Sequence, residues 1–375
     1  MEKNKIIIKE GLAKIQVSDD VFYNNKMKNL RDISVLFVKF FGDAQATVLD
    51  STCATGIRGI RYLKEAGVKN VVFLDINKSA AENTRNNLKL NKIKNKVKNI
   101  SIQEFCAGPE RGIFNFIDLD PFGSPQPHIN DIMRVAQDGS YLMITATDTA
   151  VLCGAHANAC IKSYGAEPIH NELCKESGIR ILLGYIARVT ASFNFGVEPI
   201  LSISDMHYMR VFLRVVHGAQ KAVSSMKELG FVSFCNNCRS FEYAKGLAPI
   251  LNNKCNFCKK NLKFFGPMYL GSINDKNSID KLMLYNANNR IITESDNMDK
   301  LLLKISNELD ELFFYSIPKI TKSIGYVSVS PEEIIKKLQT YGFKTSKTQF
   351  DKDGIKTNAK ITEIKKILDD IINAK

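Results

Sequence analysis

Strand-like and helix-like patterns of hydrophobic residues alternate along the first part of the chain. Short, nearly continuous apolar runs are separated by segments in which apolar positions recur at helical spacing. The strand-like runs are ATVLDS (46–51), NVVFLDIN (70–77), NISIQEF (99–105), GIFNFIDLD (112–120) and SYLMITATD (140–148). The helical segments between them are GIRGIRYLKEAG (56–67), KSAAENTRNNLKLNK (78–92) and HINDIMRVAQ (128–137). This alternation predicts an α/β fold with a doubly wound, mostly parallel, Rossmann-like sheet, which binds ligands at the carboxyl ends of its strands.

The patterns on either side of this region predict two domains. Residues 6–17 alternate as a β-hairpin does, and a helix is expected from Val21 onward. Two more strand-like runs complete a first domain, which we expect to span residues 1–218. Residues 219–375 are expected to form a smaller α+β domain, in which Ser330 caps a helix through its side chain.

Composition and charge indicate the class of protein and its expected location. It has 375 residues, of which 45% are apolar and 24% charged, as in ordinary globular proteins. No apolar run approaches the roughly 18 residues that span a bilayer, and the first residues lack the features of a signal peptide, so we expect a cytoplasmic protein with no membrane partner. The formal charge of +13 has two readings, a lysine-rich composition or an electrostatic surface for nucleic acid.

The first strand-to-helix turn, LDSTCATGIRG (49–59), carries the candidate cofactor site. A dinucleotide site would need three glycines there, and a phosphate loop would need a Lys–Ser/Thr pair after its glycines. A class I methyltransferase needs an acid at the strand end and a glycine near the ligand, and Asp50 and Gly56 meet that need. Asp75 ends the next strand, where an acid binds ribose hydroxyls in both methyltransferases and NAD enzymes. The alternative for Asp75 is a helix cap.

Asp120, Pro121 and Phe122 follow the fourth strand and resemble the Asn/Asp-Pro-Pro-Tyr/Phe motif of enzymes that methylate exocyclic amines of bases. The lone pair of such an amine is delocalised into the ring, and a carboxylate that accepts one N–H localises it. Asp120 suits that task, the carbonyl of Pro121 suits the second N–H, and Phe122 offers a face on which an extruded base stacks. The alternative is a plain turn that ends the strand. Asp118 is expected to point to the opposite face of the strand, in a structural role.

Four of the nine cysteines form a metal-binding pattern. Two C-x2-C pairs are separated by 16 residues, the spacing of a two-knuckle zinc ribbon, here over 231–262. The four expected ligands of a structural Zn²⁺ are Cys235, Cys238, Cys255 and Cys258. Redox pairs or unrelated cysteines are the alternatives. Aromatic and basic residues around the ribbon suit either nucleic acid or the packing of a small metal domain.

These residues together resemble the tRNA (guanine-N2)-dimethyltransferases of archaea and eukaryotes, which act on the guanine at position 26 of tRNA. The segments that carry the resemblance are EG (10–11), FYNNKMKNLRD (22–32), TGIRGIRY (55–62), DLDPFGSP (118–125), YLMITATDTAVLCG (141–154), ESGIRILLGYIAR (176–188) and FFGPMYLGSI (264–273). The resemblance implies contacts to S-adenosylmethionine from Arg31, from Arg58 or Arg61, and from Asp75. It further implies catalysis by Asp120 and a guanine held by Phe22 and Phe122.

Three segments depart from the family pattern. The family reads Asn-Pro where this chain has Asn24-Asn25, and it ends its third strand in Asp-Ala-Asn to hold the adenine. In this chain Glu104 is expected to bind the adenine amine, with Phe105 at its flank. Near the end of the chain the family has a His where this chain has Gln349, and Lys356 is expected to reach a phosphate.

The function expected from the sequence is S-adenosylmethionine-dependent methylation of the N2 of a guanine in tRNA, with tRNA bound through the ribbon and the C-terminal domain. No obligate protein partner is implied. One alternative is methylation of another exocyclic amine in RNA or DNA. Another is a non-catalytic zinc-ribbon protein that binds nucleic acid.

Overall fold

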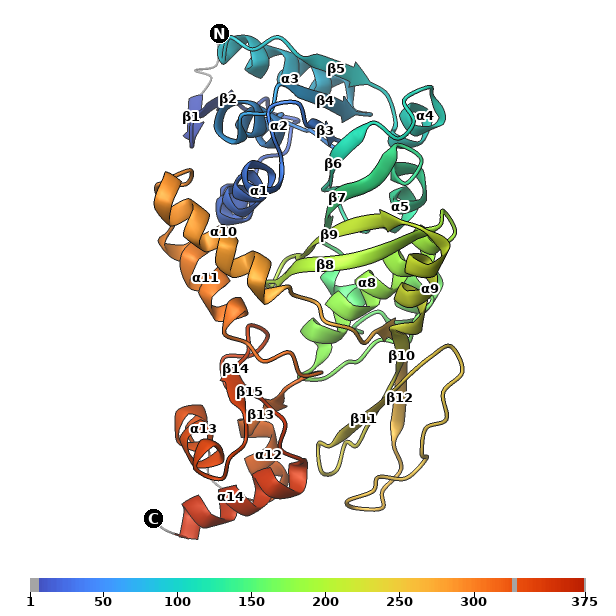
Figure 1. The fold of residues 1–375 in the computed structure, drawn as a ribbon, viewed down its shortest axis with the longest axis vertical. Coiled ribbons are helices and arrows are strands. Elements are labelled where there is room, and N and C mark those ends of the chain that lie inside the picture. Colours follow the sequence, from blue (N-terminus) through green and yellow to red (C-terminus); the bar gives the residue numbers. More distant parts are fainter. Residues whose placement is uncertain (1–6, 326–328, 374–375) are drawn as a thin grey trace.

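A 7-stranded mixed sheet forms the centre of the molecule in the computed structural model, which describes residues 7–325 and 329–373 (Figure 1). In spatial order its strands are β5 (Lys96–Asn99), β4 (Asn70–Asp75), β3 (Thr47–Asp50), β6 (Phe114–Leu119), β7 (Ala136–Ala146), β9 (Met209–His217) and β8 (Phe195–Ser204). The first five are parallel, whereas β9 is antiparallel to both of its neighbours. The predicted α/β, Rossmann-like class is therefore confirmed.

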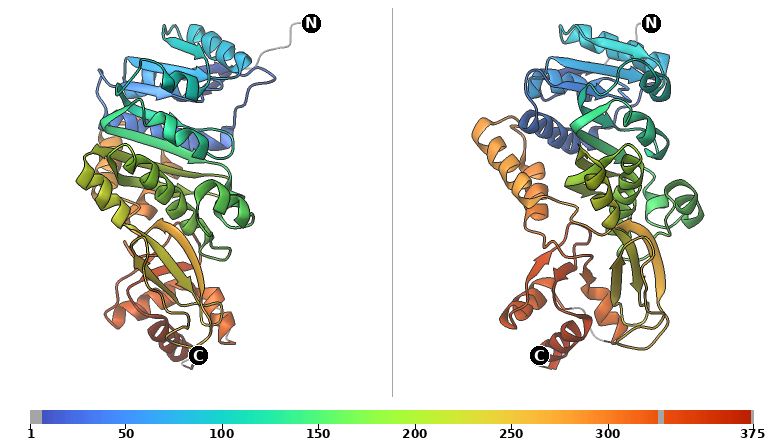
Figure 2. Two further views of the ribbon diagram at one scale, coloured as in Figure 1. Left: turned by 90° about the vertical axis from the view of Figure 1, so that its right-hand side faces the viewer. Right: turned by 45° about the vertical axis from the view of Figure 1, so that its right-hand side comes forward.

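Helices cover both faces of this sheet (Figure 2). Successive strand residues point to opposite faces, so Val48 packs in one core and Leu49 in the other. The helices on the Val48 side are α1 (Lys28–Phe41), α2 (Ile57–Arg61) with the π-helical turn η2 (Tyr62–Ala66), α3 (Lys78–Leu90), α10 (Lys276–Asn289) and α11 (Asp296–Ser306). Those on the Leu49 side are α4 (Ile102–Ala107), α5 (Gln126–Ile132), α6 (Thr149–Leu152), α7 (Ala157–Tyr164) and α8 (Cys174–Ala191).

The N-terminal hairpin forms as predicted from the first described residue onward, with β1 (Ile7–Glu10) paired to β2 (Ala13–Gln16). The helix expected from Val21 begins later, with the 3-10 turn η1 (Asn25–Met27) and then α1. The side chain of Asn24 accepts a hydrogen bond from the backbone N–H of Lys26 and so caps that turn. Residues 21–24 are thus left in a non-helical segment.

The strand expected over 99–105 is wrong in both position and length. The chain forms β5 earlier, over Lys96–Asn99, and then the short helix α4. Ser101 is the reason for the change, because its side chain accepts a hydrogen bond from the backbone N–H of Glu104 and caps α4.

Helix α9 (Ala219–Lys227) lies beside α8 and β8, and the other remaining elements lie toward the C-terminal end of the long axis (Figure 1). Helix α9 leads into a three-stranded ribbon, and a second small sheet and three helices follow α11. These elements are β10 (Leu229–Phe234), β11 (Phe241–Lys245), β12 (Lys263–Tyr269), β13 (Tyr315–Ser316), α12 (Ile317–Ser323), α13 (Pro331–Thr340), β14 (Thr345–Lys347), β15 (Gly354–Thr357) and α14 (Ile361–Asn373). Ser330 caps α13 as predicted. No helix in the described part of the chain is long and apolar enough to cross a membrane.

The hydrophobic cores show how these elements join the sheet. Residues of β10 and β12 share the core of α8, while α10 and α11 pack in the core of α1. A separate core joins α12, α13, α14 and β15. The division of the chain at residue 218 stays a prediction.

Candidate active site and metal site

A cavity of about 1030 Å³ opens at the carboxyl ends of β3, β4 and β6. The strand-to-helix connections meet there because neighbouring parallel strands end at the same edge of the sheet. Its wall includes residues from the segments 20–27, 51–58, 75–77, 100–103, 120–122 and 205–208. Of the residues predicted from the sequence, Phe22, Arg31, Arg58, Asp75, Asp120, Pro121 and Phe122 line this cavity.

Asp120 lies directly after β6 and pairs with Arg58 of α2. Its Oδ2 accepts hydrogen bonds from Nε and Nη2 of Arg58, at 2.9 and 2.6 Å. Burial raises the pKa of Asp120, but Arg58, Arg210 and a hydrogen bond from Thr145 outweigh burial, and the net pKa is lowered. The Thr145 hydroxyl in turn accepts a hydrogen bond from Nη1 of Arg210 at 2.6 Å. Asp120 is therefore held as an ionised carboxylate at neutral pH.

Asp118 lies behind Asp120 rather than on the opposite face, so that prediction is wrong. Residues two apart in a strand point to the same side. Asp118 Oδ1 accepts a hydrogen bond from Arg210 Nη2 at 2.8 Å, and Oδ2 lies 3.9 Å from Nη1 of Arg58. The Tyr62 hydroxyl donates to the same Oδ2. Asp118 is buried and does not line the cavity.

Asp75 ends β4 in the cavity wall, and both of its carboxylate oxygens accept backbone hydrogen bonds. Oδ2 accepts from Ala54 at 2.9 Å and Oδ1 from Asn77 at 2.9 Å. The helix cap of α3 is Asn77, whose side chain accepts from the backbone N–H of Ser79. Each oxygen of Asp75 keeps a further lone pair, so the carboxylate can accept hydrogen bonds from a ligand as well.

Asp50 and Gly56 shape the turn after β3 without lining the cavity. Asp50 is buried, and its Oδ2 accepts a hydrogen bond from the backbone N–H of Gly59 at 3.0 Å. Gly56 has a φ of 75°, and a Cβ placed there would lie 2.8 Å from Cγ2 of Thr84. Asp50 and Gly56 therefore fix the backbone conformation of the turn, while Ser51 and other residues of the turn line the cavity.

Arg31 and Arg61, both predicted to contact a cofactor, are paired with the buried carboxylate of Glu10. The Nη2 of Arg31 lies 2.5 Å from Glu10 Oε2, and the Nη1 of Arg61 lies 2.9 Å from Oε1. Arg61 also pairs with Asp32 and Glu65, at 2.7 Å each, and does not line the cavity. Its placement contradicts a contact with a ligand there.

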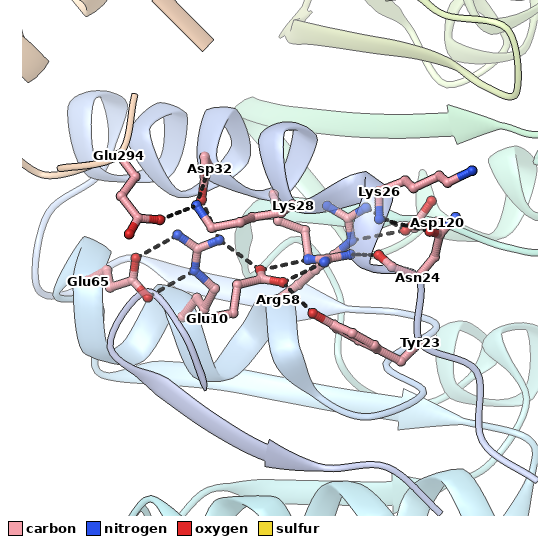
Figure 3. Close-up of polar contacts among 12 residues, drawn as sticks. Glu10, Tyr23, Asn24, Lys26, Lys28, Asp32, Arg58, Glu65, Asp120 and Glu294 are labelled. Atoms are coloured by element: carbon pink, nitrogen blue, oxygen red, sulfur yellow. Dashed lines mark hydrogen bonds and ion pairs between the residues drawn. The ribbon is translucent and has the colours of Figure 1, made fainter. Parts of the chain in front are cut away.

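The Glu10 cluster also fixes the segment before α1. The Tyr23 hydroxyl donates to Glu10 at 2.9 Å (Figure 3). The Nη1 of Arg31 donates to the backbone carbonyl of Asn24 at 3.0 Å. Phe22 is the neighbour of these anchored residues. The hairpin, α1 and α2 are thus connected to the part of the chain that covers the cavity.

Phe22 and Phe122, which come from distant parts of the sequence, meet at the cavity. Their ring centroids are 4.6 Å apart, and the rings are nearly perpendicular at 78°. Phe22 is 48% exposed and Phe122 is 73% exposed, unusual for such apolar side chains. A flat base would need about 7 Å to fit between two parallel rings, twice the van der Waals spacing. A base therefore stacks on the free face of one ring, or the rings must separate.

The residues placed near the adenine by the sequence are not at the cavity. Glu104 is exposed on α4, and Phe105 is buried in the core below it. The cavity wall is instead formed by Ser101, Ile102 and Gln103, at the start of α4. β5 ends at Asn99 and not at Phe105 as expected, so the residues that follow the strand and line the cavity come earlier in the chain.

The four predicted metal ligands come together at one end of the ribbon. Their sulfur atoms all lie within 4.8 Å of one another. The Sγ atoms of Cys235 and Cys258 are 3.4 Å apart, and those of Cys238 and Cys255 are 3.5 Å apart. Tetrahedral Zn²⁺ with Zn–S bonds of about 2.3 Å would hold its sulfurs about 3.8 Å apart, so the group fits the metal.

The two knuckles have the same backbone conformation. The carbonyls of Cys235 and Cys255 accept hydrogen bonds from the N–H of Arg239 and Lys259, respectively. Both of these basic residues have a positive φ, of 65° and 62°. The repeated turn brings each C-x2-C pair into the same orientation, as a shared metal requires.

Two basic residues of the C-terminal part, one of them expected to reach a phosphate, are engaged within the protein. Lys356 is only 3% exposed and pairs with Glu176 and Glu308, so the expectation that it reaches a phosphate is wrong. Arg239 at the ribbon donates from Nε to Glu172 at 2.9 Å. Neither side chain is available to a phosphate in this arrangement.

Sequence reasoning missed the partners that hold the site together. Arg210 is fully buried in β9, and Glu10 is buried in β1. A charged residue inside an otherwise apolar strand, as in YMRVFLRVV, was the available signal for Arg210. The loop 205–208 gave no such signal, because its place in the cavity wall depends on the β8–β9 turn.

Known proteins support this picture along nearly the whole chain. Residues 2–369 match the family model described as N2,N2-dimethylguanosine tRNA methyltransferase. A tRNA (guanine(26)-N(2))-dimethyltransferase of Methanobrevibacter smithii is 36% identical over 386 residues, with 98% of each chain covered. One of Thermococcus kodakarensis is 34% identical, covering 98% of this chain and 99% of the relative.

A solved structure agrees with these relatives. The complex of Trm1 from Pyrococcus horikoshii with S-adenosyl-L-methionine has a TM-score of 0.89 and 33% identity, covering 96% of this chain and 99% of that chain. The resemblance noted from the sequence motifs is thereby confirmed. The chain belongs to the N2,N2-dimethylguanosine tRNA methyltransferase family.

Proposed function

We propose that this chain transfers methyl groups from S-adenosylmethionine to the exocyclic N2 of guanine 26 in tRNA, forming N2,N2-dimethylguanosine. The observation that carries the proposal is the carboxylate of Asp120 beside two exposed aromatic rings, in a large cavity at the strand ends. The relatives named for this activity match the chain from end to end.

The cavity offers a place for each part of the cofactor. Asp75 is suited to the ribose hydroxyls, since its oxygens keep free lone pairs. Ile76, which is 75% exposed in the cavity wall, and Ile102 offer apolar surfaces for the adenine. Arg58 is the buried cation nearest to Asp120 and is suited to a carboxylate. When bound, S-adenosylmethionine supplies a methyl group on a positively charged sulfur.

Asp120 and its neighbours act on the target amine. Phe22 and Phe122 hold the extruded guanine by stacking. Asp120 accepts one N2–H bond, which localises the nitrogen lone pair, and the carbonyl of Pro121 accepts the other. As the new N–C bond forms, the bond from the methyl carbon to the sulfur breaks and its electron pair stays on the sulfur, while the nitrogen becomes strongly acidic and its proton passes to Asp120. A carboxylate of lowered pKa is sufficient for that proton, and its permanent negative charge is what orients the amine.

The zinc ribbon and the C-terminal elements are proposed to hold the tRNA, with Zn²⁺ bound by the four cysteines in a closed structural site. The net charge of +13 favours phosphate contacts, which lose affinity as salt is added. The smaller C-terminal part is proposed as an α+β domain built around this ribbon.

Labelled S-adenosylmethionine should be incubated with the protein and with separate tRNA, rRNA and DNA pools, followed by nucleoside mass spectrometry. We expect N2-methylated and N2,N2-dimethylated guanosine in tRNA alone. The control is Asp120→Asn, which should reduce methyl transfer by about 100-fold or more while tRNA affinity changes little. Label in DNA alone, or normal turnover by Asp120→Asn, would contradict the proposal.

A further inference from the structure

Four charged side chains are buried where the C-terminal part of the chain meets the helices of the main sheet. They are Glu176 and Arg180 on α8, Glu308 after α11, and Lys356 on β15, and we name them the junction cluster. Lys356 Nζ lies 3.1 Å from Glu308 Oε1 and 3.4 Å from Glu176 Oε2. Arg180 Nη2 lies 2.8 Å from Glu176 Oε1. One lysine thus connects two acids that come from different parts of the chain.

Hydrogen bonds extend the junction cluster into the surrounding backbone. Glu176 accepts from the N–H of Phe313 at 2.9 Å, and Lys356 donates to the carbonyl of Glu311 at 2.9 Å. Arg180 donates to the carbonyls of Tyr269 and Gly271, at 3.1 and 3.0 Å. The end of β12, the segment after α11 and β15 are therefore all tied to α8.

A second set of contacts lies beside the first. Glu308 accepts hydrogen bonds from the Thr348 hydroxyl at 2.7 Å and from the backbone N–H of Gln349 at 3.0 Å. The Gln349 side chain reaches the main sheet, where Nε2 donates to the carbonyl of Ser202 in β8 at 3.0 Å. The loop between β14 and β15 is thereby connected to the sheet as well as to α8.

Stability alone does not account for burying these charges. Removing ions from water is costly, and apolar residues of similar size stabilise a buried contact equally well or better. The same junction already buries Phe313, Phe314 and Phe350 in the core of α8. The buried ions add geometric specificity, because their hydrogen bonds are satisfied in only one orientation of the C-terminal part relative to the main sheet and its helices.

The orientation of the C-terminal part matters because the two regions proposed to contact tRNA, this part and the cavity, are far apart. Figure 1 places the C-terminal helices α12 to α14 at the opposite end of the long axis from α3 and β5. A tRNA that touches both the C-terminal part and the cavity must find them at a fixed separation. A displacement of about 1 Å at a reacting centre lowers a rate by as much as 100-fold.

We propose that Lys356, with Glu176 and Glu308, is a positioning group that sets the orientation of the C-terminal part, so that a tRNA held there presents its base to the cavity. The proposal rests on the proposed function for its substrate. It assigns to the ESGIR and GIKT segments a role in the alignment of the tRNA rather than in contact with it.

The variant Lys356→Met tests the proposal by removing the cation that the two acids share. Glu176 keeps Arg180 as its partner, and Glu308 keeps Thr348 and the backbone of Gln349. We expect the KM for tRNA to rise by about tenfold or more, while the Kd for S-adenosylmethionine, measured by calorimetry, changes by less than about twofold. An unchanged KM, or a parallel loss of cofactor affinity, would overturn the proposal.

Two further variants make the result specific. Lys89→Met makes the same substitution at an exposed position of α3, at the far end of the molecule, and should behave as the unaltered protein. Gln349→Leu removes only the hydrogen bond to β8 and should raise the KM for tRNA in the same direction by a smaller factor. If Lys356→Met does not fold, the same readouts on Gln349→Leu decide the question.

A measurement without substrate separates this proposal from the proposed function. Small-angle scattering of Lys356→Met should show a broader distribution of distances than the unaltered protein, because the C-terminal part samples more orientations. An unchanged distribution would overturn the positioning role, whatever the activity. Absence of tRNA methylation by the unaltered protein would contradict the proposed function alone.

Discussion

At the scale of single residues, the cavity shows how the partners of a carboxyl group decide its charge. Asp120 has Arg58 directly beside it, and its pKa is lowered. Asp50 lies in the same cluster but takes its hydrogen bond from the backbone of Gly59. Burial first, and then the charge of Asp118, raise the pKa of Asp50 to about 8, although Arg58 opposes them. Asp50 is therefore protonated at neutral pH, whereas Asp120, which faces the cavity, keeps its negative charge.

Asp50→Asn should make the protein less sensitive to pH. The unfolded chain loses the Asp50 proton near pH 4, whereas the folded chain keeps it up to about 8. The folded state binds the extra proton between these values, so the free energy of unfolding falls as pH rises through that window. The stability of the variant relative to the unaltered protein should grow by up to about 1.4 kcal/mol per pH unit, measured by urea unfolding from pH 5 to about pH 8. Asp43→Asn, at an exposed position, should show no such trend, and a constant difference for Asp50→Asn would contradict the assignment.

At the scale of secondary-structure elements, the buried carboxylate of Glu10 joins three elements that carry parts of the site. It lies on β1, and its partners Arg31 and Arg61 lie on α1 and α2. Burial raises the pKa of Glu10, but the two arginines and the Tyr23 hydroxyl outweigh burial and lower it to about 2. A depressed pKa means that the stabilisation is present above about pH 4.3 and is lost only as the pH falls toward 2.

Glu10→Gln should destabilise the protein by about 3 to 5 kcal/mol, because it leaves the buried Arg31 without a charged partner and removes one of the carboxylates that pair with Arg61. Glu294→Gln is the matched control. Glu294 also pairs with a cation of α1, Lys28 at 3.5 Å, but its side chain is 83% exposed, and its loss should cost at most about 1 kcal/mol. Denaturant unfolding near neutral pH gives both values, and equal effects of the two substitutions would contradict the role given to the Glu10 cluster.

At the scale of the whole molecule, the ribbon that carries the four cysteines lies between the other parts and contacts both. Arg239 pairs with Glu172, which precedes α8, while Phe241 stacks on Tyr315 at 5.1 Å and meets Phe313 edge to face. The four cysteines lie at one end of this ribbon. A metal held by these cysteines is therefore expected to matter for how the C-terminal part is held, and not for the cofactor cavity.

Cys238→Ser should lose the bound zinc, which elemental analysis of the unaltered protein should show at about one ion per chain. Methyl transfer to tRNA should fall, while the affinity for S-adenosylmethionine, measured by calorimetry, should stay within about twofold. Cys153→Ser, outside the cluster, should retain both zinc and activity. Equal zinc content in the two variants would show that the cluster does not hold the metal.

The sequence alone determined what depends on local pattern and spacing. Alternating apolar periods give the sheet and its helices, and strand ends give the edge at which Asp75 and Asp120 both line the cavity. The spacing of the two C-x2-C pairs brings four sulfurs together, because each knuckle is a local turn.

The tertiary structure decided which charges are free to act. Lys356, Arg61 and Arg31 look alike in the sequence, as basic residues in family motifs. In the structure all three are buried and form ion pairs with carboxylates from distant segments of the chain. Likewise, only folding brings Phe22 to Phe122 across a hundred residues of chain. A partner supplied from a distant segment leaves no periodic trace in the sequence, so the availability of a side chain becomes known only when the chain is folded.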